Sequence, residues 1–241
     1  MNLLAFDCST EQLSAAVQRG GTQWRTNTAG GAHASGAIID TLSSLMGRAG
    51  LALADLDAIV VGRGPGAFTG LRTACAVAQG LAYGARAHGS DMPVLPVDTL
   101  LAVAEAARLL HTRARSVLAL LDARMDEVYT AEYVFENTGM WRCVRSPQVC
   151  APEEVPAPAS PGTVLAGNAF AAYDLRLPAA LAELQRIEAL PTAPALLRLA
   201  PALLATGSAV PAEQALPRYI RNRVALTTAE REAQREANAS N

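Results

Sequence analysis

The sequence GRGPGAFTGLRT, residues 62–73, places four glycines and a proline directly after the apolar run at residues 58–61. A buried strand, a glycine-rich turn and a helix often build an anion-binding loop, because the first N–H groups of a helix are unpaired. Leu71 stands where a Walker A loop has lysine, and Thr69 stands where the dinucleotide fingerprint has its third glycine. The stretch therefore predicts either a nucleotide site or a tight structural turn. The glycines that would permit close approach of the backbone are Gly64, Gly66 and Gly70.

The helix predicted at residues 70–86 carries a row of small residues. Ala76, Gly80 and Gly84 recur every four residues, so they form one bare ridge on the helix surface. Each glycine inside a helix costs about 1 kcal/mol relative to alanine, and close approach of another helix is the usual compensation. That second helix is either the one predicted at residues 35–48 of this chain or a helix of a partner protein.

The rest of the chain reads as an α/β protein in which one pattern occurs twice. The apolar runs at residues 3–6 and 116–121 are typical of buried strands, and each is followed by an aspartate. These aspartates, Asp7 and Asp122, lie 115 residues apart, and hairpin-connected strands follow both. The repetition predicts two similar lobes. We expect them at residues 1–97 and 98–215, with a tail at 216–241 that returns to the first lobe.

Further elements follow from hydrophobic periodicity and turn residues. Asp98 is a candidate N-cap for the helix that follows it. The five prolines of residues 147–162 predict an exposed loop. Further strands are predicted at 13–18, 23–28, 93–96, 127–135 and 141–150, and further helices at 98–111, 178–189 and 192–205.

Composition excludes several classes of protein. A hydrophobic fraction of 51% in 241 residues is enough to form a core, and a net charge of −2 gives no broad basic surface for nucleic acid. The N-terminus lacks the pattern of a signal peptide, and no apolar run approaches the ~20 residues of a membrane span. We therefore expect a cytoplasmic protein with no membrane partner.

The cysteines and the basic residues near the C-terminus each allow a simple interpretation. None of the cysteines forms a CxxC pair, so buried, reduced thiols are expected rather than a zinc site or disulfides. Arg218, Arg221 and Arg223 either make modest phosphate contacts or pair with acidic neighbours. The cysteines are Cys8, Cys75, Cys143 and Cys150.

Groups for catalysis are scarce. His33, His88 and His111 include no pair four residues apart that could share a metal, and no GxSxG nucleophile motif is present. The carboxylates of Asp7 and Asp122, at two strand ends, either hold a hydrated magnesium ion or only cap turns. The set that would form a remnant active site is Asp7, Ser9, Thr10 and Asp122.

Four segments, in order, resemble the bacterial TsaB family, once called YeaZ. They are LLAFDCSTEQLSAAV (3–17), GRGPGAFTGLRTACAVAQGLA (62–82), LALLDARMDEVYTAEY (118–133) and PRYIRNRVA (217–225). The resemblance implies the actin-like ATPase and sugar-kinase (ASKHA) fold, with two similar lobes that each hold a mixed sheet and helices. The older peptidase label of the family has no support in these residues.

The same resemblance implies a role in making N6-threonylcarbamoyladenosine at position 37 of tRNAs that read codons beginning with A. In that family the chain is the non-catalytic partner of TsaD, which carries an HxxxH metal pair and transfers the threonylcarbamoyl group. The ATPase TsaE joins the complex, so ATP and magnesium act through the partners and this chain needs no cofactor. Contact with tRNA is then indirect, and the nucleotide site at Asp7, Ser9, Thr10 and Asp122 is degenerate.

The resemblance also implies that the first two helices dock on TsaD, or on a second copy of the chain in a homodimer. An exposed face that carries Ile38, Leu71 or Cys75 would support this. The predicted interface residues are Ile38, Leu42, Leu45, Leu71, Cys75, Ala76, Gly80 and Gly84.

Two rival functions stay open on the sequence alone. A phosphotransferase of the sugar-kinase type would use Asp7 and Asp122 and turn over ATP with magnesium. A stand-alone regulatory module would act as a homodimer without TsaD.

Overall fold

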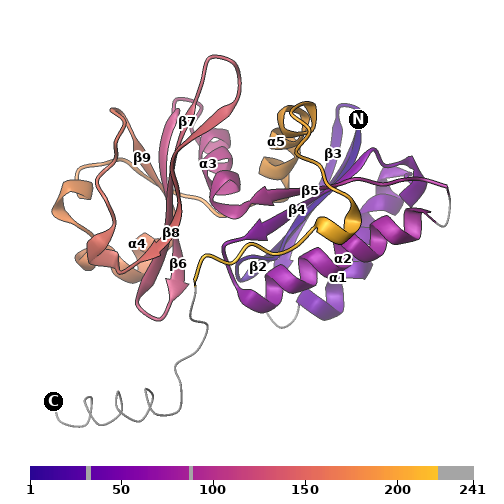
Figure 1. The fold of residues 1–241 in the computed structure, drawn as a ribbon, viewed down its shortest axis with the longest axis horizontal. Helices are drawn as coiled ribbons and strands as arrows, with labels where there is room; N and C mark the ends of the chain where they lie inside the picture. The colour runs from indigo at the N-terminus through magenta and orange to yellow at the C-terminus, as the bar shows by residue number, and fades with distance from the viewer. Residues whose placement is uncertain (31–33, 87–88, 222–241) are drawn as a thin grey trace, which may run out of the picture.

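The computed structural model describes residues 1–30, 34–86 and 89–221 and contains two lobes that stand side by side (Figure 1). His33, His88 and the predicted tail after residue 221 lie outside the described residues. No helix in the described part of the chain is long and apolar enough to cross a membrane.

The first lobe is built on a five-stranded mixed sheet. The central strand β1 pairs antiparallel with β2 and parallel with β4. In spatial order the strands are β3 (Thr22–Ala29), β2 (Gln12–Arg19), β1 (Asn2–Asp7), β4 (Ala58–Gly64) and β5 (Val94–Asp98).

The second lobe repeats this plan. Its central strand β6 pairs antiparallel with β7 and parallel with β9, so β6 corresponds to β1. This confirms the predicted duplication, and two such lobes form the ASKHA fold. The spatial order is β8 (Trp141–Cys150), β7 (Glu127–Phe135), β6 (Ser116–Arg124), β9 (Val164–Gly167) and β10 (Arg186–Glu188).

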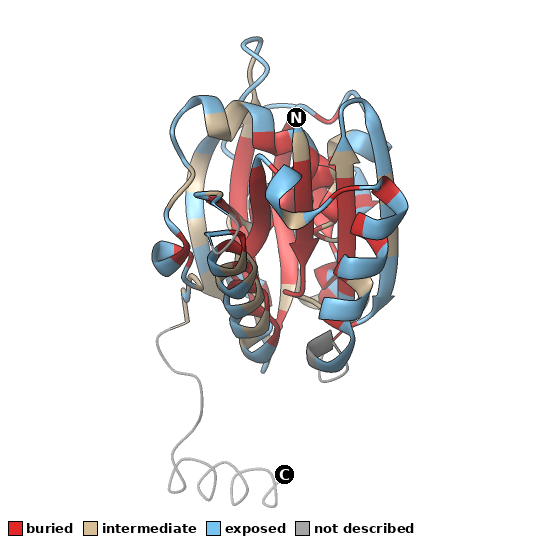
Figure 2. Ribbon diagram, turned by 90° about the vertical axis from the view of Figure 1, so that its right-hand side faces the viewer, coloured by how far each residue is buried: buried red, intermediate tan, exposed pale blue. Residues whose placement is uncertain are grey.

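Helices cover both faces of each sheet. In the first lobe, seen in Figure 2, the strands are buried and the outer sides of the helices are exposed. The first sheet packs against α1 and α2 on one face and α5 on the other, while the second packs against α3 and α4. The helices are α1 (Ala34–Ala49), α2 (Phe68–Arg86), α3 (Thr99–Leu110), α4 (Ala169–Tyr173) and α5 (Ala193–Ala205). Short 3-10 helices are η2 (Leu53–Asp55), η3 (Pro152–Glu154), η4 (Asp174–Arg176), η5 (Ala179–Leu181) and η6 (Ala212–Gln214).

Two local predictions in the second lobe are wrong. The helix predicted at 178–189 is instead the short η5 followed by β10, because Ile187 alone points into the core between two exposed charged residues. The loop predicted at 147–162 is partly a continuation of β8, and Pro152 and Val155 are buried.

The predicted boundary of the second lobe at residue 215 is also incorrect. Helix α5 packs its buried face, including Leu196 and Ala200, on the first sheet. The backbone N–H of Ala193 donates to the Ser14 hydroxyl of β2, at 2.9 Å. The chain therefore returns to the first lobe at α5, more than twenty residues earlier than the tail predicted to do so.

The glycines in the loop before α2 and in its first turn are needed for contact with protein backbone. A Cβ at Gly70 would lie 1.9 Å from the carbonyl oxygen of Cys8, and one at Gly66 would lie 2.4 Å from that of Ser9. A Cβ at Gly64, where φ is +116°, would lie 2.7 Å from the carbonyl oxygen of Arg218. These contacts favour the structural-turn interpretation of the loop.

One alternative required the bare ridge on α2 to pack against another helix of this chain. The described structure does not show such packing. Ala76 and Gly80 are exposed, and a Cβ built at Gly80 meets none of the described atoms within 4 Å. At Gly84 a Cβ would make an ordinary contact with Leu53, at 3.6 Å. Within the described chain, no contact with another helix therefore compensates for the free-energy cost of placing Gly80 in α2.

Two alanine substitutions in α2 should have opposite effects. Gly70→Ala should lower the free energy of unfolding by about 2 kcal/mol or more, because its methyl group overlaps the Cys8 carbonyl. Gly80→Ala should raise it by about 1 kcal/mol, because the methyl group enters open space in a helix. Urea unfolding of both variants measures the difference, and equal effects would contradict the assigned contacts.

Candidate functional site

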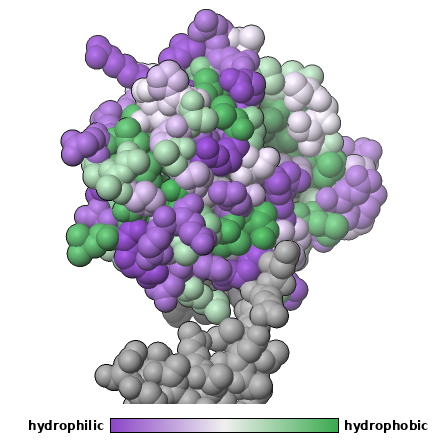
Figure 3. Space-filling model, turned by 60° about the vertical axis from the view of Figure 1, so that its left-hand side comes forward, coloured by the Kyte–Doolittle hydropathy of each residue, from purple (hydrophilic) through white to green (hydrophobic). Residues whose placement is uncertain are grey.

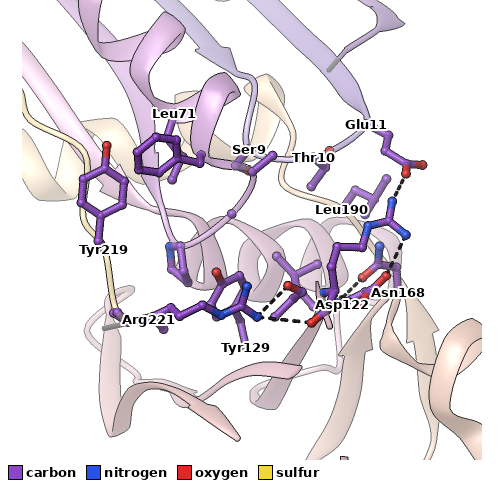
Figure 4. Close-up of a pocket in the computed structure, with 18 of the residues that line it drawn as sticks. Ser9, Thr10, Glu11, Leu71, Asp122, Tyr129, Asn168, Leu190, Tyr219 and Arg221 are labelled. Carbon is purple, nitrogen blue, oxygen red and sulfur yellow. Dashed lines mark hydrogen bonds and ion pairs between the residues drawn. The ribbon is translucent and has the colours of Figure 1, made fainter. Parts of the chain in front are cut away.

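A cavity of about 580 Å³ lies between the lobes (Figure 4). Its walls come from the turn after β1, the loop before α2, the end of β6 and the chain after residue 217. The predicted residues Ser9, Thr10 and Asp122 all line it, whereas Asp7 lies behind the wall. The structure thus brings three of the four predicted site residues to one cavity.

Asp7 is completely buried at the end of β1. Its Oδ1 accepts hydrogen bonds from the Ser9 hydroxyl, at 2.6 Å, and from the Ser9 backbone N–H, at 2.8 Å. Its Oδ2 has no hydrogen-bond partner among the described residues and packs against Gly62, where a Cβ would overlap it. Burial raises the Asp7 pKa from 3.8 to about 6, although the two Ser9 hydrogen bonds lower it.

Ser9 and Thr10 form the turn that follows Asp7. The Ser9 hydroxyl donates to Asp7, and the Ser9 carbonyl accepts the N–H of Ala67, at 2.8 Å. The Thr10 hydroxyl accepts the N–H of Gln12, at 3.3 Å. Both hydroxyls therefore take part in turn geometry at the cavity wall.

Asp122 has the equivalent position in the second lobe, and its carboxylate is also occupied. It accepts the Tyr173 hydroxyl, at 3.0 Å, and the N–H of Arg124, at 2.7 Å. The Arg124 guanidinium lies 3.2 Å from the other oxygen. These contacts match the turn-capping alternative, and the described residues contain no group of three metal-ligating His, Cys, Asp or Glu side chains.

Sequence reasoning missed the charged pair that bridges the cavity. The Arg124 guanidinium of the second lobe pairs with Glu11 of the first lobe (Figure 4). Asn168 accepts the N–H of Asp122, at 2.9 Å. Glu11, Arg124 and Asn168 are far apart in sequence, so their contacts become visible only when the two lobes are placed together.

The chain after residue 217 also forms part of the wall. Arg218 pairs with Asp98, at 2.5 Å, and Arg221 pairs with Glu127. The acidic-pairing alternative is thus confirmed for these two arginines, while Arg223 lies outside the described residues. Asp98 precedes α3 as predicted, but its side chain makes no cap bond within the described chain, because it binds Arg218 and Arg63 instead.

The expected exposed face at Ile38, Leu71 and Cys75 is not present. These side chains are at most 2% exposed. Ile38 packs in the core under the first sheet, and Leu71 faces Gly64 and the interlobe cavity. The outer sides instead carry small residues with two large apolar ones, Ile39 and Tyr83, which are 48% and 47% exposed. The same correction applies to Leu42 and Leu45, which are buried. The small exposed residues are Gly36, Ala37, Ser43, Ser44, Gly47, Ala76 and Gly80.

The cysteines divide into two groups. Cys8 and Cys75 are buried, and burial raises the pKa of the Cys75 thiol to about 11, which favours the unreactive neutral form. Cys150 is partly buried, but Cys143 is exposed on β8, so the prediction of buried thiols is wrong for Cys143.

Comparison with known proteins gives the context of this site. The family described as "TsaD: tRNA N6-adenosine threonylcarbamoyltransferase" matches residues 27–227. The chain is 35% identical to the tRNA threonylcarbamoyladenosine biosynthesis protein TsaB of Escherichia coli, over 93% of this chain and 96% of that protein. It is 40% identical to TsaB of Haemophilus influenzae, over 64% of this chain and 66% of the relative.

A solved structure shows the same fold. YeaZ from Pseudomonas aeruginosa superposes with a TM-score of 0.81 at 38% identity, covering 90% of this chain and 99% of that one. The similarity therefore includes both lobes.

Replacing Asp7 with asparagine should stabilise the protein in a pH-dependent way. The folded carboxyl has a pKa near 6 and the free group 3.8, so the folded state binds more protons between these values. Stability contributed by this group therefore falls as pH rises through that window, by at most about 3 kcal/mol. The Asp7→Asn variant should have a higher free energy of unfolding than the unmodified protein above about pH 6 and show no gain below about pH 4.

Urea unfolding across this pH range measures the effect. Ser9→Ala is the matched control, because loss of its hydroxyl should raise the Asp7 pKa further and move the window upward. A difference between Asp7→Asn and the unmodified protein that is independent of pH would contradict the assignment.

Proposed function

Because the chain belongs to the TsaB (YeaZ) family, we propose that it is the non-catalytic scaffold and activating subunit that binds TsaD. The complex, with TsaE, adds the threonylcarbamoyl group to N6 of adenosine 37 in tRNAs that read ANN codons. TsaD transfers the group, and ATP and magnesium act through the partners. This chain acts in the cytoplasm, touches tRNA only through the complex and forms a homodimer through the same face when alone.

The exposed side of α1 and α2 carries this proposal. Among its charged residues, such as Asp40, Arg48 and Arg72, it exposes several glycines, alanines and serines, where another pair of helices can approach the backbone closely. Gly80 has open space in front of it among the described atoms, and its cost of about 1 kcal/mol would be offset only when a partner helix packs there. Ile39 and Tyr83 supply exposed apolar area beside the small residues.

On the side of the second lobe, hydrophobic residues are scattered among hydrophilic ones (Figure 3).

The state of the interlobe site supports a role without catalysis. The Asp122 carboxylate is held by Tyr173 and Arg124, and the Asp7 carboxylate is buried behind the wall. The three histidines of the chain include no pair spaced as HxxxH, which TsaD uses for its metal. This chain and TsaD would then share a fold, and TsaD alone would carry the catalytic groups.

Reconstitution tests the proposed activity. Threonylcarbamoyl transfer to tRNA by TsaD and TsaE should fall about tenfold or more when this chain is omitted, since activation by a bound subunit is a coupling of that size. Equal transfer without it would overturn the proposal. Magnesium-dependent ATP turnover by the isolated chain, lost in Asp7→Ala, would instead identify a phosphotransferase.

Gly80→Leu should weaken binding to TsaD about tenfold or more, because the new side chain keeps the two helix pairs apart. Folding should be retained, since no described atom lies where the side chain begins. Titration calorimetry measures affinity and thermal unfolding measures stability. The matched control Gly80→Ala should bind within a few-fold of the unmodified protein, and wild-type affinity of Gly80→Leu would place the interface elsewhere.

A further inference from the structure

The last described segment of the chain, residues 216–221, connects three parts of the molecule, and we call it the strap. Just before it, the chain runs along α2: Gln79 donates to the carbonyl of Ala215, at 3.2 Å. Further on, the Arg72 guanidinium donates to the Tyr219 hydroxyl, at 3.0 Å. The segment therefore runs antiparallel to α2 and reaches its first turn.

At that turn Tyr219 completes a stack of side chains. Its ring lies 5.2 Å from the ring of Phe68, the first residue of α2. The Arg72 guanidinium lies 3.7 Å from the centre of the Phe68 ring on the same turn. Phe68 and Arg72 thus both contact a residue from the far end of the chain.

The middle of the strap is fixed where the lobes meet. The N–H of Arg218 donates to the carbonyl of Arg63 on β4, at 2.8 Å. Its guanidinium shares the Asp98 carboxylate with the guanidinium of Arg63, at 2.5 and 2.7 Å. Charge-assisted bonds of this kind are stronger than neutral ones, so Arg218 attaches the strap firmly to the first lobe.

The end of the strap holds the second lobe. Arg221 donates to the carbonyls of Ala123, at 2.8 Å, and Arg124, at 3.3 Å, and pairs with Glu127. These residues flank the β6–β7 turn, in which residues 124–126 have positive φ. The two carbonyls are at the edge of the cavity, so the strap passes from one rim to the other.

Other contacts keep the lobes together without the strap. Arg198 of α5, which covers the first sheet, donates to the buried Glu105 of α3 in the second lobe, at 2.8 Å. Ala102 of α3 and Trp141 of β8 also pack in the same buried cluster as α5 and the first sheet. Release of the strap would therefore open the cavity rim while both lobes stay attached.

We propose that the strap is a lid over the interlobe cavity and that its closed position orders the first turn of α2. Opening of the lid and docking of a partner on α2 are then coupled, and docking favours the closed lid. The lid itself is a property of the isolated chain, whereas the coupling rests on the proposed function of α2.

Hydrogen exchange of the isolated protein tests whether the strap orders α2. Tyr219→Ala removes the ring contact and the Arg72 bond, so amides in residues 68–73 should exchange faster, on the order of tenfold. Tyr219→Phe keeps the ring and should show a smaller increase. Arg186→Ala, which removes an exposed ion pair with Asp174 in the second lobe, is the matched control and should leave these amides unchanged.

Labelling tests whether the strap closes the cavity. A cysteine introduced at Thr10, on the cavity wall, should react with a bulky maleimide about tenfold faster when Tyr219 is also replaced by alanine. Peptide mass spectrometry separates this site from the exposed Cys143. If exchange changes only within residues 216–221 and labelling of residue 10 is unaltered, the strap is not a lid and the proposal fails.

Titration with TsaD then tests the coupling. Tyr219→Ala should weaken TsaD binding by several-fold, on the order of the change in exchange at residues 68–73. If Tyr219→Ala binds TsaD with wild-type affinity although residues 68–73 exchange faster, the coupling is overturned and the lid proposal stands. Failure of the unmodified chain to bind TsaD would overturn the proposed function, and the exchange and labelling results would still decide the lid.

Discussion

The close contact between the glycine loop and the turn after β1 sets the geometry of the whole first lobe. Carbonyl oxygens of Cys8 and Ser9 occupy the space that side chains at residues 70 and 66 would need. This contact fixes where α2 begins, and α2 in turn supports the strap and presents the bare ridge. Loops of this kind usually surround a phosphate, but here the protein's own backbone fills the space. The glycines of the loop therefore have a structural use.

The two lobes show how one fold diverges. Asp7 and Asp122 end equivalent strands, yet Asp7 is sealed behind a wall while Asp122 faces the cavity and binds Tyr173 and Arg124. The buried carboxylate is kept although its burial costs stability at neutral pH.

Sequence patterns predicted the duplicated lobes, both central strands and the limits of α1, α2 and α5, because these features depend on local periodicity and turn residues. They did not reveal which side of α1 and α2 is outermost, since Ile38 and Ile39 are equally apolar and only packing separates them. The Glu11–Arg124 contact was likewise missed, and acidic pairing of Arg218 was expected without its partner Asp98, because both contacts join residues more than a hundred positions apart. The short strands β9 and β10 are too brief for a reliable pattern.

The return of α5 to the first sheet has a consequence for synthesis on the ribosome. Strand β1 leaves the exit tunnel almost two hundred residues before the helix that covers its second face. Until then Leu3, Ala5 and Val60 have no α5 to bury them, although the second lobe can already form its own core. The first lobe is thus completed last, and the long separation between its parts makes this step slow and vulnerable to aggregation.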